Sequence, residues 1–149
     1  MTCGGAAGYV VIVETERSTG IEGGLLVVNG YGEPLAFCRN RGTFGHTALW
    51  RGKFGRGHLL RSLVRSLQEA SSVQPDVLLF SANSEWQPND LDLTLPLGVI
   101  RAGRVNWVTD RPGEETPAAA VLEALQRHNL LTEPVDRCRE ALRQTGLRE

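Results

Sequence analysis

Short apolar runs separated by turn residues fill the first part of the chain and predict β-strands. Residues 9–13 (YVVIV) form a continuous β-branched run, which is typical of a strand covered on both faces. Residues 23–28 (GGLLVV) and 35–38 (LAFC) flank the sequence Asn-Gly-Tyr-Gly at 29–32, where glycine and asparagine tolerate a positive φ. The pattern therefore predicts a first strand followed by a hairpin.

From His58 onward the apolar residues recur at helical spacing, as Leu60, Leu63, Val64 and Leu67. Another side of this helix carries His58, Arg61 and Arg65. Residues 76–81 (DVLLFS) then read as a fourth, buried strand. A strand, a helix and a further strand form a crossover, which favours parallel pairing, so we expect a mixed sheet.

The rest of the chain predicts a second hairpin and two helices. Residues 97–100 and 104–109 flank Ala102-Gly103, a turn signal. Thr116-Pro117 opens a helix with an N-cap and an early proline, and a final helix begins near Glu133-Pro134. The expected fold class is mixed α/β, with the order strand, hairpin, helix, strand, second hairpin and two C-terminal helices.

The length of 149 residues and the hydrophobic content of 41% allow one ordinary core, so we expect a single domain, 1–149. The longest apolar runs, such as 25–28 and 77–80, are too short to span a membrane, and the N-terminus does not resemble a secretory signal. We therefore expect a soluble, cytoplasmic protein. Cys3, Cys38 and Cys138 are odd in number and widely spaced, which indicates reduced thiols.

Charge is strongly segregated along the chain. Between Pro34 and Gln68 there is no acidic residue, and the seven cations there are Arg39, Arg41, Arg51, Lys53, Arg56, Arg61 and Arg65. Residues 39–57 are also rich in glycine and aromatic residues, which predicts a long basic loop before the helix. We expect these cations to converge on one accessible face and to create a local positive field.

Phe44, Trp50 and Phe54 lie among these cations. Aromatic rings between guanidinium groups can stack on bases while the cations neutralise phosphates. The expected nucleic-acid-binding or partner-binding residues are Arg39, Arg41, Trp50, Arg51, Lys53, Phe54, Arg56, Arg61 and Arg65. Two alternatives stay open: the face docks on an acidic protein surface, or the arginines pair with acids of the same domain.

The order of elements over residues 9–81 resembles the opening β-β-β-α-β unit of the RNase H-like fold. The resemblance implies three carboxylates that hold two divalent metal ions: one on the first strand, one on the first helix and one at the end of the fourth strand. The first strand offers Glu14, or Glu16 just beyond it, and the helix offers Glu69 at its far end. The fourth strand ends without an acid before Glu85. The resemblance therefore implies a degenerate member without a complete metal site.

Histidine and cysteine add no catalytic set. His46, His58 and His128 contain no pair at a helical ligand spacing, and Cys38 falls where a strand should bury it. The glycines at 52–57 precede a helix but do not match the phosphate-binding pattern G-x-x-x-x-G-K-[ST]. We expect no metal site and no cofactor.

These observations predict a non-catalytic accessory protein of a larger complex, without membrane association, which binds nucleic acid or a nucleoprotein partner through its basic face. One alternative is a metal-dependent nuclease that uses Glu14 with Glu16 or Asp76 and requires Mg²⁺. The other alternative is a structural subunit whose basic loop docks on an acidic protein.

Overall fold

The computed structural model describes residues 5–14, 20–43, 53–82, 86, 88, 91 and 94–147. Within these residues six strands form one mixed sheet in the order β3-β2-β1-β4-β5-β6. The strands are β1 (Ala7–Glu14), β2 (Gly20–Val28), β3 (Pro34–Thr43), β4 (Val77–Ser81), β5 (Leu97–Arg101) and β6 (Arg104–Trp107). The strands β1, β2 and β3 are antiparallel neighbours, β4 runs parallel to β1, β5 parallel to β4, and β6 antiparallel to β5.

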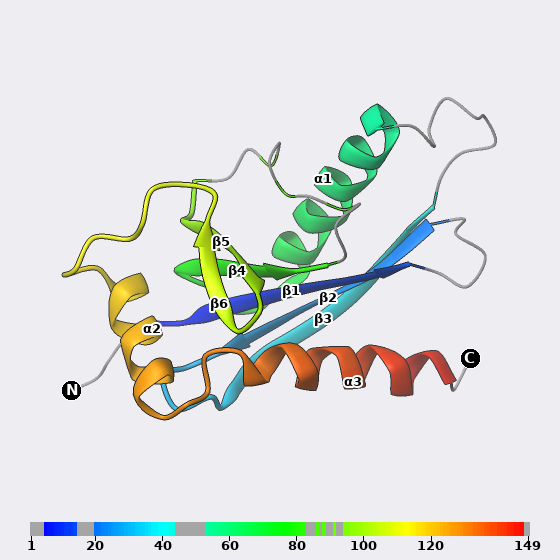
Figure 1. Cartoon of the computed structure of the whole chain (residues 1–149). Helices are drawn as coiled ribbons and strands as arrows, with labels where there is room; N and C mark the ends of the chain where they lie inside the picture. The colour runs from blue at the N-terminus through cyan, green and yellow to red at the C-terminus, as the bar shows by residue number, and fades with distance from the viewer. Residues whose placement is uncertain are drawn as a thin grey trace.

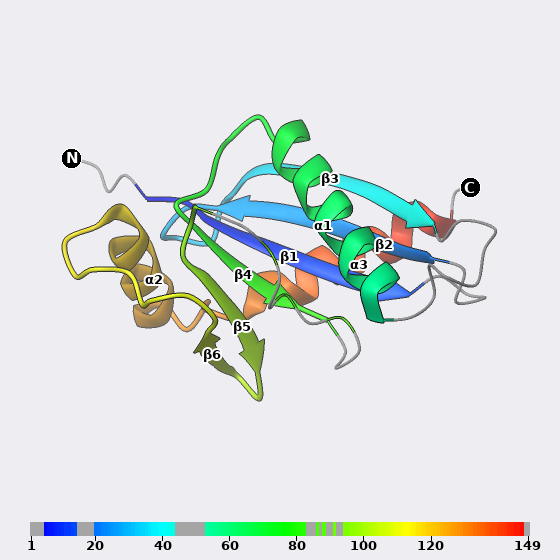
Figure 2. The same cartoon turned by 90° about the horizontal axis from the view of Figure 1, so that it is seen from above.

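Helices cover both faces of the sheet. On one face lies α1 (Lys53–Ala70), and on the other lie α2 (Pro117–Arg127) and α3 (Glu133–Leu147), as Figure 1 shows. The view in Figure 2 places α1 across one side of the sheet, with β3 along one edge and β6 along the other. The connection from β3 through α1 to β4 is therefore a crossover that passes over β2 and β1.

This arrangement explains the continuous apolar run of β1. Val10 and Ile12 belong to the core beneath α1, while Tyr9 and Val11 belong to the core beneath α2 and α3. Successive side chains of a strand point to opposite faces, so a strand with helices on both sides needs apolar residues at every position. Trp86 also lies in the core on the α1 side, with 2% of its surface exposed.

The predicted element order is confirmed, and the mixed α/β class with it. Both predicted hairpin turns are present. In the first, the N–H of Gly32 donates to the carbonyl of Asn29 (3.0 Å), and Gly32 has a φ of 76°. In the second, Ala102 and Gly103 both have positive φ values, as the tightest hairpin turns require. Thr116 caps α2 by accepting a hydrogen bond from the N–H of Ala119 (3.2 Å).

The prediction of a loop over residues 39–57 is wrong at both ends. The strand β3 continues to Thr43, because residues 39–43 pair with residues 20–24 of β2. The helix α1 already begins at Lys53, in spite of Gly55 and Gly57. Tertiary packing outweighs helix propensity here. At the point of contact, a Cβ on Gly42 would lie 2.7 Å from Cδ1 of Leu59, so the glycine lets α1 approach β3 closely.

No helix among the described residues combines the length and the apolar character that crossing a bilayer requires.

Two buried groups that can lose a proton, the Cys138 thiol and the Tyr9 hydroxyl, should lower the stability of the fold at alkaline pH. Burial raises the pKa of the Cys138 thiol to about 12, and burial together with the charge of Glu133 raises the pKa of the Tyr9 hydroxyl, which donates to the carbonyl of Leu131. In the unfolded chain these groups ionise near pH 8.5 and 10 respectively. Above these values the folded state binds more protons than the unfolded state. The contribution of these two groups to the free energy of unfolding is therefore fully present at lower pH and is lost as the pH rises.

The free energy of unfolding should therefore fall above about pH 9, by up to roughly 1.4 kcal/mol per pH unit for each group. Urea titrations between pH 7 and 10.5 in the presence of a reductant measure this slope. Cys138→Ala should flatten the slope, whereas Tyr31→Phe, at an exposed tyrosine, should leave it unchanged. An unchanged slope in Cys138→Ala would contradict the assignment.

Candidate nucleic-acid interface

The structure divides the expected binding residues between two elements. Arg39 and Arg41 lie on β3, whereas Lys53, Phe54, Arg56, Arg61 and Arg65 lie on α1. Trp50 and Arg51 fall outside the described residues, as do the side chains of Lys53 and Phe54. Among the remaining arginines, Arg56 is half-buried, and the faces on which Arg39, Arg41, Arg61 and Arg65 lie can be compared.

The arginines of β3 point to the face of the sheet opposite α1. On the α1 side, Cys38 Sγ donates to the carbonyl of Leu67 (3.2 Å), and Asn40 Nδ2 donates to Ser66 Oγ (2.9 Å). Because side chains alternate along a strand, Arg39 and Arg41 project to the side of α3. The expectation of one continuous basic face is therefore corrected: Arg39 and Arg41 do not share a face with Arg61 and Arg65.

Arg39 and Arg41 share one carboxylate across the β2–β3 ladder. Glu22, the direct cross-strand partner of Arg41, accepts through Oε2 from Nη2 of Arg39 (2.8 Å) and of Arg41 (2.7 Å). Nη1 of Arg39 is buried without a hydrogen-bond partner among the described residues. The internal pairing that the sequence left open thus holds for these two arginines, although one acid faces two cations.

Arg61 and Arg65 of α1 differ from the described arginines of the other helices in their partners. Each described arginine on α2 and α3 pairs with an acid one turn away: Arg127 with Glu123, Arg137 with Glu133, Arg139 with Asp136 and Arg143 with Glu140. In contrast, Arg61 and Arg65 form no ion pair with any described residue, and Arg65 is exposed. Glu69 is the nearest acid along α1, and it makes no ion pair with Arg65.

Among the described residues, the carboxylates do not form the cluster that the RNase H-like resemblance implies. Within the described ranges, no three His, Cys, Asp or Glu residues lie close enough to hold a metal ion. Glu14 is exposed at the end of β1, while Glu16 and Glu85 fall outside these ranges. The last residue of β4 is Ser81, and its Oγ lies 3.5 Å from Nη2 of Arg139. A positively charged side chain of α3 therefore lies beside the end of β4.

The suggested pairing of Glu14 with Asp76 is wrong. Asp76 precedes β4 and accepts a hydrogen bond from the N–H of Ala6 (2.9 Å), at the start of β1. Glu14 is the last residue of β1, eight positions further along the same strand. At about 3.3 Å per residue, the two carboxylates are roughly 25 Å apart, too far for them to share a metal site.

The thiols and imidazoles of the described residues have structural surroundings. Burial raises the pKa of the Cys38 thiol, which disfavours the thiolate that nucleophilic chemistry needs. His128 lies against Tyr31, with 5.6 Å between the ring centroids, at the junction of α2 and the first hairpin. His58 is exposed on α1, and His46 lies outside the described residues.

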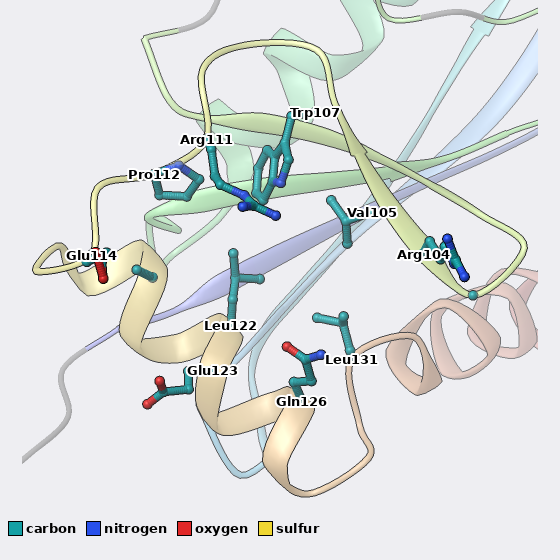
Figure 3. A pocket seen from close by; sticks show the side chains of 12 residues that line it. Arg104, Val105, Trp107, Arg111, Pro112, Glu114, Leu122, Glu123, Gln126 and Leu131 are labelled. Carbon is teal, nitrogen blue, oxygen red and sulfur yellow. The ribbon is translucent and has the colours of Figure 1, made fainter.

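The sequence reasoning missed a cavity of about 440 Å³ between the β5–β6 hairpin and α2 (Figure 3). Its apolar wall consists of Val105, Trp107, Leu122 and Leu131. Arg104 and Arg111 contribute cations from the hairpin and the segment after it, while α2 contributes Glu123 and Gln126. No single sequence segment signals this cavity, because its walls come together only when α2 packs beside the hairpin.

A comparison with protein-family models and one with curated proteins found no match. Among solved structures, endonuclease V from Bacillus subtilis matches with 17% identity and a TM-score of 0.38, over 63% of this chain and 43% of that one. Ribonuclease H2 from Pyrococcus horikoshii OT3 matches with 7% identity and a TM-score of 0.38, over 92% and 76%. The chain thus spans less than half the length of the endonuclease V chain.

With TM-scores below 0.5, both likenesses are weak. The observed strand order and the β3–α1–β4 crossover form the β-β-β-α-β unit that the sequence predicts.

Proposed function

We propose that this chain is a non-catalytic accessory protein that binds nucleic acid, alone or within a nucleoprotein complex, through the outer side of α1. The observation that supports this proposal is the contrast in ion pairing between two arginines of α1 and the described arginines of α2 and α3. Arg61 and Arg65 have no acidic partner among the described residues, whereas the four described arginines of α2 and α3 each have one.

This contrast matters for binding because a paired arginine must give up its carboxylate before it can neutralise a phosphate. An arginine without a partner has only bound counterions to release, and that release favours association. Arg65 follows Arg61 by four positions, so their Cβ atoms lie about 6 Å apart on the same side of the helix. Two such cations can contact neighbouring phosphates of one strand.

We include the beginning of α1 in the proposed surface because of its sequence. Lys53, Phe54 and Arg56 belong to its first turns, and no acidic residue stands in the first turn. The exposed N–H groups of a helix start add partial positive charge, which complements Lys53 and Arg56. Trp50 and Arg51 immediately precede the helix in sequence, and we include them in the proposed surface. Arg39 and Arg41 belong to the other side of the sheet.

The surroundings of the end of β4 support the non-catalytic part of this proposal. A nuclease of the RNase H-like type needs carboxylates that hold two metal ions near the scissile phosphate. Here Ser81 and Arg139 stand at the end of β4, and a guanidinium group there repels divalent cations. The nuclease alternative, with Glu14 as a ligand and Mg²⁺ as cofactor, makes a different prediction about cleavage.

Titration of a fluorescent 20-nucleotide duplex by anisotropy tests the proposal. Two phosphate contacts predict a slope of log K against log salt of about −1.8, so affinity should fall about tenfold between 50 and 200 mM salt. No binding at 50 mM, or binding that is independent of salt, would refute it. Binding of poly-L-glutamate without binding of the duplex would favour the acidic-protein alternative instead.

The same duplex, incubated with Mg²⁺, should stay intact. Magnesium-dependent cleavage that is lost in Glu14→Gln would replace the accessory role with the nuclease alternative.

A further inference from the structure

The cavity on the α2 side of the sheet has the size and the lining of a small-molecule site. Its volume is about 440 Å³, and it lies between the β5–β6 hairpin and α2, as Figure 3 shows. Sites for small ligands measure about 300–1,000 Å³ and combine an apolar wall with a few polar groups. Gly103, Arg111 and Gln126 of the lining are exposed, so the cavity opens to solvent.

Trp107 forms the aromatic part of the wall because Gly98 lets it lie close to the sheet. The two residues are direct cross-strand partners on β6 and β5. A Cβ on Gly98 would lie 3.2 Å from Cε3 of Trp107 and 2.5 Å from Cγ1 of Val105. A side chain at this position would therefore push the indole ring and Val105 toward α2, into the space of the cavity. The half-buried Leu122 of α2 forms the facing apolar wall.

Arg111 places a positive charge beside this aromatic wall. Both Arg111 and Trp107 line the cavity, and Figure 3 shows the guanidinium group next to the indole ring. Arg111 is exposed and forms no ion pair with any described residue. The other cation of the lining, Arg104, lies at the hairpin turn, at the opposite end of the cavity. A guanidinium group without a partner, next to an open aromatic surface, complements an aromatic anion.

The two acids of the lining do not cancel this charge at the wall. Glu123 pairs with Arg127, with 3.0 Å between Oε1 and Nη2, and Figure 3 shows its side chain turned away from Trp107. Glu114 lies in the turn before α2, set apart from Trp107 in the same view. The charged group that meets the aromatic surface is therefore the guanidinium group of Arg111.

We propose that this cavity binds a small planar aromatic carboxylate. The ring would lie between Trp107 and Leu122, and the carboxylate would accept two hydrogen bonds from Arg111, whose planar fork of donors matches it. One guanidinium group at the wall balances the single charge of a carboxylate. The amide of Gln126, which also lines the cavity, would bind a polar substituent of the ring.

Titrations of the full chain with 2-naphthoate, followed by calorimetry and by the NMR signal of the Trp107 indole N–H, test this proposal. The probe should bind and shift that signal. The amide 2-naphthamide keeps the ring and lacks the charge, so it should bind about tenfold or more weakly. Decalin-2-carboxylate keeps the charge and lacks the planar ring, so it should bind about threefold or more weakly.

Two variants assign the binding to this cavity. In Arg111→Gln the affinities for 2-naphthoate and 2-naphthamide should differ by less than about twofold, because the charge that distinguishes them is gone. Ala119→Trp places a large side chain in the cavity and should abolish the binding of both probes. The matched control is Arg143→Gln on α3, outside the lining, which should bind as the native chain does. Since Arg111 is exposed, the charge test stands even if Ala119→Trp fails to fold.

Several results would overturn the proposal. They are no binding of 2-naphthoate at millimolar concentration, binding without a shift of the Trp107 signal, or equal affinities of the native chain for 2-naphthoate and 2-naphthamide. Tighter binding of 2-naphthylmethylamine would make the cavity a site for an aromatic cation instead. Because α2 and α1 cover opposite faces of the sheet, none of these results bears on the proposed nucleic-acid surface.

Discussion

Charge reversal at Arg61 and Arg65 is expected to remove most of the oligonucleotide binding of this chain. Each phosphate contact that releases counterions makes the affinity at 50 mM salt about tenfold higher than at 1 M salt. The loss of two contacts should therefore weaken binding roughly 100-fold at 50 mM salt. The variant Arg61→Glu/Arg65→Glu should also lower the magnitude of the salt slope by about two. Anisotropy titrations at four salt concentrations measure both effects.

The matched control is Arg127→Glu/Arg143→Glu, which changes the net charge equally. Both control residues are exposed, and both are paired within their own helices, with Glu123 and Glu140. If binding depends on the surface of α1, the control should change affinity by less than about threefold. An equal loss in both variants would mean that net charge alone drives the association, and the assignment to α1 would then be wrong.

The order of the elements could be predicted because each element carries its own local signal. The run at residues 9–13 indicates a strand buried on both faces, and the structure places helices on both sides of β1. Ala102-Gly103 and Thr116-Pro117 mark a turn and a helix start through backbone preferences that need no distant contact.

The extent of β3 and α1 could not be predicted in this way. The strand continues through Arg39 and Arg41 because residues of β2, Glu22 among them, pair with it from about twenty positions away. The helix begins among glycines because Leu59 packs over Gly42. Both contacts join residues that are distant in the sequence. The local sequence contains mainly polar residues and glycines, which are typical of a loop.

The arrangement of the candidate arginines in space could not be predicted from the sequence, for a related reason. A count of charges along the chain correctly identifies a segment without acids, but it does not register that a strand alternates its side chains between two faces. That alternation sends Arg39 and Arg41 toward α3 and Cys38 toward α1. Once β3 is known to reach Thr43, the alternation of side chains places Arg39 and Arg41 on the face opposite Cys38 and Asn40, which contact α1.

Glu22 is expected to contribute to stability far more than an exposed acid does. Its side chain is 15% exposed and holds Arg39, which is 21% exposed and already has one buried nitrogen with no hydrogen-bond partner in the described part of the chain. Glu22→Ala would leave two adjacent cations with no carboxylate between them. The removal of one member of a buried pair costs about 3–5 kcal/mol, and the half-exposed Arg41 reduces this to about 2 kcal/mol.

Urea denaturation at pH 7 measures this loss, with Glu140→Ala as the control. Glu140 is half-exposed and pairs with Arg143 on α3, so its removal should cost less than about 0.5 kcal/mol. Adding Arg41→Ala to Glu22→Ala should restore part of the stability, because it removes the repulsion between the two guanidinium groups. Equal stabilities of Glu22→Ala and the native chain would show that Arg39 and Arg41 hold their positions without Glu22.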